Sequence, residues 1–331
     1  MISSFTKWAI LPLLAGMALS TAVHAERLSI STWGSPLHPQ VKDFIPAFTE
    51  ALKENSDGAF RLRVFQGGEM VKQEFVATAI PQGTVDISLT TLDTWSGRVS
   101  DVSILTSPLW NKSMQWTKNH LLPGQPIFEY FNEKFKEQGA VILAMFDIGP
   151  AVVASRDPIA LPKDIKGHSI RVYSRGAGLI IQELGGSPVT MGVGDVYSAL
   201  QRGTIDGAMG GLGGAVGLKY YEVANYMLAQ NGVIGSLVHA YVMNKDKYDK
   251  LSPELRKALV DAVASARDTM QQVLIDTYAK QLDEVRQAGN IVTELTPGSP
   301  DWKTWEAALQ NLSASARQSY PSPLVGLVTA E

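Results

Sequence analysis

Cysteine is absent from the 331-residue sequence. Its absence excludes disulfide bonds, thiolate metal sites, a cysteine nucleophile and a lipid-modified N-terminal cysteine. A chain without such cross-links must be held together by a large hydrophobic core. Hydrophobic residues make up 45 % of the sequence, which is enough for such a core, and the length favours two domains.

Long apolar runs and strong charge are also missing. After the first 25 residues no stretch approaches the roughly 18 uninterrupted apolar residues of a membrane-spanning helix, so we expect a soluble mature protein. The formal net charge is only −3. Such mild acidity argues against a nucleic acid or another polyanion as partner.

The N-terminus has the pattern of an export signal. Lys7 supplies a positive charge, residues 8–19 form an apolar segment, and Val23-His24-Ala25 offers a small-residue cleavage site. The apolar segment is too short for a membrane anchor. We therefore expect residues 1–25 to be a signal peptide that is removed after Ala25, and the mature protein to lie in the periplasm.

Familiar catalytic and metal-binding motifs are missing as well. The sequence contains no Gly-x-Ser-x-Gly elbow, no His-Glu-x-x-His pair and no Walker-type phosphate loop. After removal of the signal, four histidines are left, and they lack the spacing of metal ligands: His38, His120, His168 and His239. We predict no metal, no cofactor and no catalytic residue, and we treat a periplasmic enzyme as the less favoured class.

Apolar periodicity predicts alternating strands and helices, which is typical of α/β proteins with parallel sheets. Strands are expected at 28–33, 60–65, 85–91, 141–146, 152–155, 168–172, 233–243 and 291–295. Helices are expected at 39–55 with a kink at Pro46, at 75–82, 125–139 and 253–288, and from Trp302 onward. Three tryptophans in the less regular stretch 92–124 fit either a ligand site or a packed core.

A short internal repeat indicates two lobes of similar construction. Residues 79–87 read AIPQGTVDI and residues 199–207 read ALQRGTIDG. Each copy has the pattern of a helix end, a glycine cap and a strand that begins at once. Its aspartate is expected to bond nearby backbone amides in the turn.

Arg171 is the candidate binding residue that the pattern itself identifies. It lies near the carboxyl end of the predicted strand 168–172, and ligands in open α/β sheets bind outside the carboxyl ends of strands. A guanidinium offers a planar fork that matches a carboxylate. A salt bridge to a neighbouring Asp or Glu is the alternative, and the residue alone does not separate the two.

The predicted helix at 253–288 is too long for one small lobe. With about 35 residues on one apolar stripe, we expect it to brace both lobes. We assign residues 26–147 and about 234–275 to a first lobe, and residues 148–233 and about 276–331 to a second.

Several motifs together resemble the solute-binding proteins of tripartite ATP-independent periplasmic (TRAP) transporters, the family of the C4-dicarboxylate-binding component. They are DIKGHSIRV at 164–172, SPVTM at 187–191, DVYSALQRGTIDG at 195–207, KYYEVANY at 219–226 and QGTVD at 82–86. The resemblance covers the mature chain. It implies an α/β, two-lobed periplasmic binding protein fold with a ligand cleft between the lobes and long bracing helices. It also implies that a small organic acid is delivered to membrane permease subunits.

The same resemblance implies a set of ligand-binding residues. Arg171 matches the arginine that clamps the ligand carboxylate in the family. Further positions that typically line the cleft are occupied by Trp33, Gln73, Thr91, Ser174 and Val193.

Departures from the family pattern bear on the ligand. Ala151 stands where many relatives have a second arginine, Val193 where they have an aromatic residue, and Gly210-Gly211 where they read Asn-Pro. We count these positions among the pocket residues and predict a monocarboxylate ligand, with a sulfonate left open. A bulky body stacked on Trp33 and a small ligand both fit the pattern.

Two other classes of function are weighed against transport. A ligand-sensing or adaptor protein for a receptor fits the same sequence features. A receptor kinase gene beside the coding sequence, in place of permease genes, would favour it. An enzyme is disfavoured by the missing motifs, and we expect the protein to act as a monomer.

Overall fold

The computed structural model describes residues 25–330. The predicted signal peptide therefore lies outside the described residues except for Ala25, and its cleavage site stays a prediction. Over the described range, no helix combines the length and the apolarity that crossing a bilayer requires.

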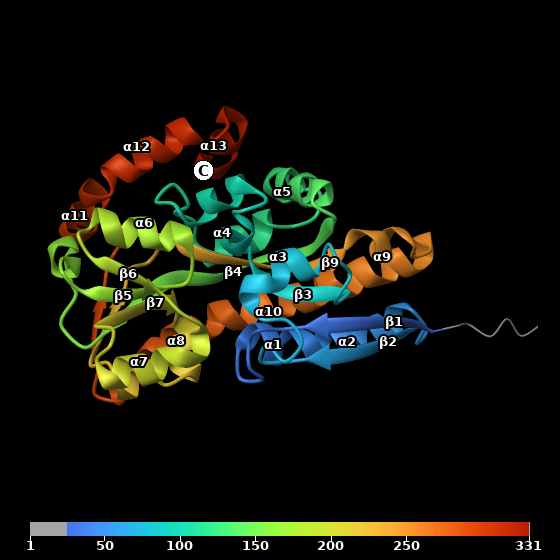
Figure 1. The fold of residues 1–331 in the computed structure, drawn as a ribbon, viewed down its shortest axis with the longest axis horizontal. Coiled ribbons are helices and arrows are strands. Elements are labelled where there is room, and N and C mark those ends of the chain that lie inside the picture. Colours follow the sequence, from blue (N-terminus) through green and yellow to red (C-terminus); the bar gives the residue numbers. More distant parts are fainter. Residues whose placement is uncertain (1–24, 331) are drawn as a thin grey trace, which may run out of the picture.

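The strands form a mixed sheet with a parallel group at each end (Figure 1). β1, β2 and β3 are parallel to one another at one end, and β5, β6 and β7 are parallel at the other. The order is β2-β1-β3-β9-β4-β7-β5-β6, and β8 pairs with both β4 and β10. The strands are β1 (Glu26–Ser31), β2 (Phe60–Phe65), β3 (Ile87–Thr91), β4 (Ala140–Ser155), β5 (Ser169–Val172), β6 (Ser187–Thr190), β7 (Gly207–Gly211), β8 (Tyr226–Ala229), β9 (Ser236–Asn244) and β10 (Ile291–Glu294).

Helices cover both parallel groups, so that each half has apolar clusters of its own. This confirms the predicted α/β fold. The helices are α1 (Pro39–Lys42), α2 (Phe44–Asn55), α3 (Val76–Ala79), α4 (Met114–His120), α5 (Pro126–Glu137), α6 (Arg175–Glu183), α7 (Val196–Arg202), α8 (Leu212–Gly217), α9 (Lys245–Asp249), α10 (Pro253–Gln287), α11 (Pro300–Ala308), α12 (Gln310–Ser319) and α13 (Ser322–Thr329).

The internal repeat has the same local structure in both halves. Asp86, before β3, accepts hydrogen bonds at 2.7 Å from the amide and the hydroxyl of Ser29 on β1. Asp206, before β7, accepts the equivalent pair at 2.8 Å from Ser169 on β5. Each aspartate thus ties the start of one parallel strand to its neighbour, and the two halves are built alike. The repeat predicted bonds to nearby amides within the turn, but the bonded serine is 57 residues away for Asp86 and 37 residues away for Asp206.

Two antiparallel strands join the halves. β4 pairs with β9 on the first side and with β7 and β8 on the second. The sequence predicted two separate strands at 141–146 and 152–155, but β4 runs through both. The register with β9 shifts at two places, between Ile142 and Ala144 and between Asp147 and Pro150. At the second place Gly149 adopts a positive φ of 103°.

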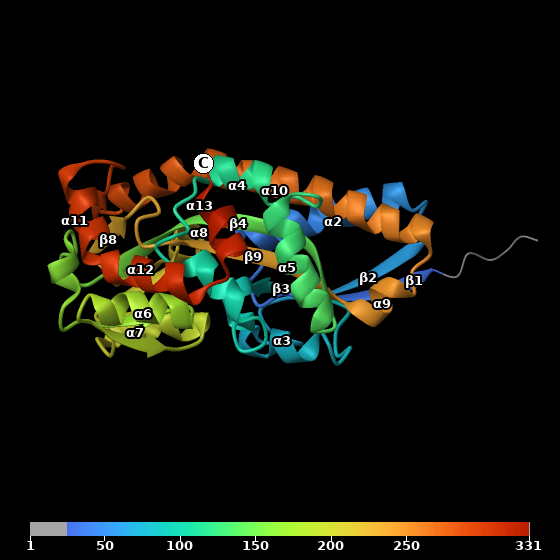
Figure 2. The same cartoon turned by 90° about the horizontal axis from the view of Figure 1, so that it is seen from above.

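The long helix α10 braces both halves, as predicted, and runs along one side of the molecule in Figure 2. Leu259 and Val263 pack in the core of the first half, whereas Leu282 and Val285 pack in that of the second. Near its middle, the buried Arg267 donates hydrogen bonds to backbone carbonyls of α4 and β4. The helix is therefore fixed to the scaffold by packing and by a buried cation.

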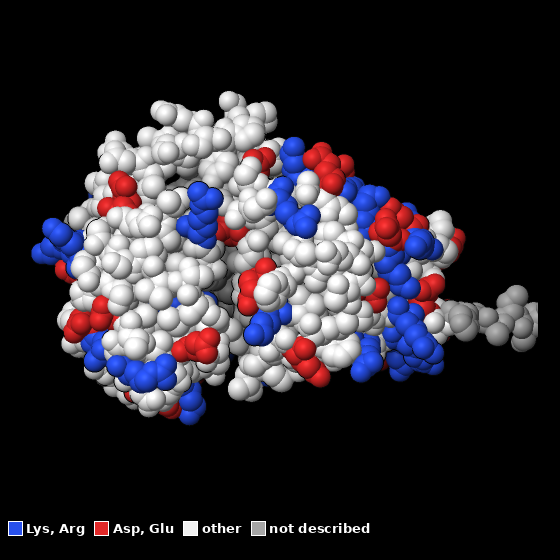
Figure 3. Space-filling model, in the orientation of Figure 1, with Lys and Arg blue, Asp and Glu red and all other residues white. Residues whose placement is uncertain are grey.

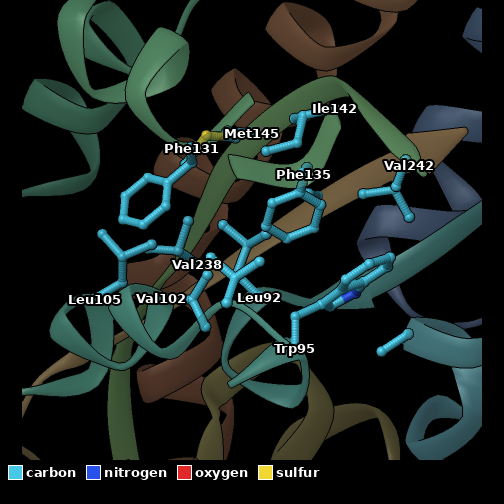
Figure 4. Packing of buried hydrophobic residues seen from close by; sticks show 14 of the residues in the cluster. Leu92, Trp95, Val102, Leu105, Phe131, Phe135, Ile142, Met145, Val238 and Val242 are labelled. Carbon is cyan, nitrogen blue, oxygen red and sulfur yellow. The ribbon is translucent and has the colours of Figure 1, made fainter. Parts of the chain in front are cut away.

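The irregular stretch between β3 and α5 fills a core instead of lining the ligand cavity described below. Trp95 and Trp110 are fully buried. Figure 4 shows Trp95 beside Phe135 of α5, with ring centroids 4.5 Å apart. Trp116 is partly buried against the same cluster. The sequence left open a ligand-binding role and a packing role for these tryptophans. Packing in the core accounts for all three of them.

Two helical boundaries differ from the prediction. The expected helix 39–55 is broken at Asp43 and not bent at Pro46, because a proline is tolerated in the first turn of the following helix, where its missing N–H has no intrahelical partner. At the C-terminus, α11 packs on the second half, but Leu324 and Val328 of α13 join the cluster of α5 in the first. The chain end thus returns to the first half (Figure 1), although we had assigned 276–331 to the second lobe.

Asp147 is a buried acid at the point where β4 crosses between the halves. It accepts hydrogen bonds from the Ser236 hydroxyl and from the Gly149 amide. Desolvation nevertheless dominates and raises its pKa from 3.8 to about 6. Because the folded state holds this proton more tightly than the unfolded state, the stabilisation is complete below pH 3.8 and is lost as the pH rises through about 6.

We predict that Asp147→Asn removes this pH dependence. A pKa difference of about 2 units corresponds to about 3 kcal/mol of unfolding free energy, so relative to wild type the variant should gain about that much between pH 4 and pH 7. Urea unfolding at a series of pH values measures the difference. Parallel pH profiles for the two proteins would show that Asp147 ionises freely in the folded state.

Candidate functional site

Arg171 lies at the carboxyl end of β5 and is only 7 % exposed. Its Nε and Nη2 donate to the Met191 carbonyl and its Nη1 to the Met209 carbonyl, all at 3.3 Å. A guanidinium has five N–H groups, so one N–H on each terminal nitrogen has no partner among residues 25–330. Two N–H groups are what a carboxylate accepts in a two-point contact.

Among residues 25–330, no carboxylate forms an ion pair with this cation. The salt-bridge alternative raised by the sequence is therefore not what the structure has. Burial lowers the pKa of Arg171, although an arginine stays protonated in proteins. A buried charge without a counter-charge is costly, which makes this position a candidate binding site for an anion.

Both halves of the protein line the small cavity at Arg171. Its volume is about 50 Å³, and it shares five lining residues with a wider groove of about 490 Å³. Figure 3 shows a furrow between the two halves with charged side chains of both signs beside it. The small cavity is lined by Trp33, His38, Gln40, Gln73, Thr91, Ile148, Arg171, Tyr173, Val193, Gly210, Gly211, Gly214, Ala215, Tyr220, Leu237 and His239.

Seven of the nine predicted pocket residues come together in this lining, and two do not. The Ser174 hydroxyl accepts the Ala177 amide at 3.2 Å and caps α6, since serine is a favoured N-cap. Ala151 is fully buried in the core of the second half, where it pairs with Gly211. These two residues were placed in the pocket wrongly.

Gly210 leaves the space beside the guanidinium open. A Cβ atom built on this residue would lie 3.9 Å from Arg171 Nη1. A longer side chain here, such as the asparagine of the family pattern, would therefore project towards the free N–H groups. The glycine leaves that volume free of side-chain atoms.

His239 is a pocket residue that the sequence analysis did not select. It stands opposite Thr91 in the β3–β9 ladder, and its Nε2 lies 3.1 Å from Thr91 Oγ1. Gln73 Nε2 donates to the same hydroxyl at 2.7 Å. Desolvation lowers the pKa of His239 to about 3, with a smaller effect of His38, so the ring is neutral. A polar residue inside the apolar run 233–243 was the signal that could have identified it.

A second cavity, of about 330 Å³, lies away from Arg171 between the segment 96–108, α6 and the C-terminal helix α12. Serines dominate its polar lining, and its one arginine, Arg175, is exposed. It lacks the buried cation of the first site. In the part of the chain that the structure covers, no cluster of three or more potential metal ligands is present.

Comparisons with known proteins agree with this architecture. Residues 30–319 match the family described as bacterial extracellular solute-binding protein, family 7. The 2,3-diketo-L-gulonate-binding periplasmic protein YiaO of Escherichia coli (strain K12) is 24 % identical over 267 residues, which cover 80 % of this chain and 79 % of that protein. The C4-dicarboxylate-binding periplasmic protein DctP of Rhodobacter capsulatus is 24 % identical over 265 residues, with coverages of 79 % and 78 %.

Solved structures share the fold over nearly the whole chain. A Bordetella pertussis extracytoplasmic solute receptor that binds pyroglutamic acid gives a TM-score of 0.81 at 18 % identity and covers 92 % of this chain and 98 % of its own. A TRAP periplasmic solute-binding protein of Chromohalobacter salexigens with bound D-glucuronate gives 0.82 at 22 % identity, with coverages of 91 % and 99 %. The chain belongs to the family-7 extracellular solute-binding proteins, the periplasmic binding components of TRAP transporters.

Proposed function

We propose that this protein captures an organic monocarboxylate between its two lobes through a clamp formed by Arg171, and delivers it to a TRAP membrane permease. The observation that carries the proposal is the buried Arg171 without a protein counter-charge. A carboxylate that fills the two free N–H positions removes that penalty. The mature protein would begin after Ala25 and act in the periplasm as a monomer.

Relatives support an organic acid as the class of ligand. The names of the two curated relatives give a sugar acid and a C4-dicarboxylate, and the two structural neighbours bind pyroglutamic acid and glucuronate. A single carboxylate is favoured here because Arg171 is the one Lys or Arg among the residues that line the 50 Å³ cavity. The buried His239 is neutral and gives a second carboxylate no counter-charge.

A binding role accounts for the site better than catalysis does. The cavity contains neutral histidines and amide, indole and phenol groups around one cation, and no acidic side chain lines it. Such a set can hold an anion. The Thr91 hydroxyl does lie beside His239 Nε2, but a histidine whose pKa is lowered to about 3 is too weak a base to activate a hydroxyl as a nucleophile. A sensor that presents the ligand to a receptor would use the same pocket, so the neighbouring genes decide between transport and sensing.

Replacing Arg171 tests the clamp. Arg171→Ala leaves a desolvated carboxylate without its partner, which costs about 2 to 5 kcal/mol and lowers affinity on the order of 30-fold to several thousand-fold. Arg171→Lys keeps the charge but loses the two-point geometry, so it should bind with intermediate affinity. The affinity is measured by calorimetry with the acids that raise the wild-type unfolding temperature in a thermal-shift screen.

Arg175→Ala is the matched control, because this exposed arginine lies four residues away and outside the 50 Å³ cavity. It should bind like the wild type. A folded Arg171→Ala protein with wild-type affinity would refute the clamp.

The two lobes also touch through a polar contact away from the cavity. Asp93, which follows β3 in the first lobe, accepts from the Gly176 amide at 3.2 Å in the first turn of α6 in the second lobe. The Ser103 hydroxyl holds the other carboxylate oxygen. The approach requires glycine, because a Cβ on Gly176 would lie 2.3 Å from Thr106 Oγ1. We propose that this contact forms when the lobes close on the ligand.

We predict that Asp93→Asn weakens ligand binding about tenfold, since losing a charge-assisted hydrogen bond costs about 1.5 kcal/mol. Asp101→Asn is the control, because Asp101 pairs with Tyr130 within the first lobe.

Small-angle scattering should show that the wild-type protein becomes more compact with saturating ligand. The Gly176→Leu variant should show a smaller decrease in its radius of gyration. Identical scattering curves with and without ligand, or an Asp93→Asn protein with undiminished affinity, would contradict closure through this contact.

A further inference from the structure

Three buried polar groups around the cavity have no hydrogen-bond partner in the described range 25–330. They are Trp33 Nε1, the Tyr173 hydroxyl and His239 Nδ1, and their residues come from the first lobe, from the end of β5 and from the crossing strand β9. All three residues line the same cavity as Arg171. A buried polar group left unpaired costs about 1 to 3 kcal/mol, so three of them around one anion site point to a ligand with polar groups of its own.

The hydrogen bonds on the Nε2 side of His239 determine whether its Nδ1 is a donor or an acceptor. The Gln73 amide nitrogen can only donate, so the Thr91 hydroxyl accepts from it. Among residues 25–330, the other hydrogen-bond partner of this hydroxyl is His239 Nε2, so the Thr91 hydrogen finds an acceptor only if Nε2 carries no hydrogen. On this ground we assign the ring hydrogen to Nδ1. Indole Nε1 is also a donor only. His239 Nδ1 and Trp33 Nε1 are therefore both unpartnered donors, and each needs an acceptor oxygen.

The volume of the small cavity shows how large a group fits beside Arg171. A single water needs about 10 to 15 Å³ of such volume, so 50 Å³ corresponds to about three to five water-sized groups. A cavity that binds benzene has about 150 Å³, three times as much. Of the two ligand sizes that the sequence left open, the space beside Arg171 therefore favours the small one, while the adjoining groove of about 490 Å³ is wide enough for a longer body. Trp33 offers a ligand its unpaired N–H as well as its flat face.

We infer that His239 is a specificity-determining residue whose Nδ1 donates to an uncharged oxygen of the ligand, so that the site takes a short 2-oxo- or 2-hydroxy-monocarboxylate. Arg171 holds the carboxylate and Trp33 Nε1 supplies a second donor to the oxygen-bearing end. This inference rests on the proposed binding function and deepens it. A simple fatty acid of the same length lacks the acceptor and leaves these donors unpaired.

Calorimetry on the purified protein with matched acids tests the inference. The probes are pyruvate and lactate against propionate, 2-hydroxybutyrate against butyrate, and succinate. Wild type should bind the oxygen-bearing member of each pair at least about tenfold more tightly, since leaving one donor unpaired costs about 1.4 kcal/mol or more. Succinate should bind more weakly than lactate, because its second carboxylate meets no cation.

Two isosteric variants isolate His239. In His239→Gln, the glutamine amide takes the position of Nε2 and can keep the bond to Thr91, but it leaves the Nδ1 position without a polar group. In His239→Asn, the asparagine amide lies near the Nδ1 position instead. His239→Gln should therefore lose the preference for lactate and pyruvate over propionate, and His239→Asn should keep part of that preference. His120→Gln, outside the cavity, should keep the wild-type preference. Circular dichroism checks folding, and Trp33→Phe, which removes one donor and keeps the packing, provides a second test.

Each other outcome overturns the inference. Equal wild-type affinities within each pair would mean that water satisfies the three groups. An oxygen preference that survives both His239→Gln and Trp33→Phe would exclude these side chains as its source, and tightest binding of succinate would exclude the monocarboxylate class. If wild type binds none of the probes and none of the other acids in the thermal-shift screen, the proposed function itself fails, which is distinct from binding without discrimination.

Discussion

A buried positive charge without a protein counter-charge is the constraint on which the site depends. Arg171 is held at the end of β5 by the carbonyls of Met191 and Met209, which orient the guanidinium but do not neutralise it. Desolvating a charge is costly unless it is paired. Closing the lobes around an empty site would therefore be unfavourable, and an anion that pairs with Arg171 offsets that cost. In this account the same charge provides affinity and links binding to closure.

The scaffold places that charge where both lobes can reach it. Parallel strands in each half gather their carboxyl ends at the cleft, and the Asp86 and Asp206 turns fix the strand starts in equivalent ways. β4, β9 and α10 pass between the halves, so the lobes are joined by continuous elements and not by a loose linker. Asp147, buried at the crossing, belongs to this connecting region and not to the lining of the cavity.

Sequence patterns predicted the features that depend on local chemistry. The glycine-capped repeat, the long amphipathic helix and the position of Arg171 at a strand end each follow from residue types within a few positions. The predictions that failed depend on which way one side chain turns. Ser174 caps its own helix, Ala151 faces the core, and the tryptophans after β3 pack beside α5. His239 was missed because its partners, Thr91 and Gln73, are more than 140 residues away in the chain.

The central claim, that Arg171 clamps the ligand carboxylate between the lobes, is tested most directly by a crystal structure of the protein with a bound acid. The account predicts two carboxylate oxygens within about 3.2 Å of Nη1 and Nη2 of Arg171, with residues of the first lobe around the rest of the ligand. A ligand whose carboxylate lies elsewhere, while Arg171 contacts only the two carbonyls, would contradict it.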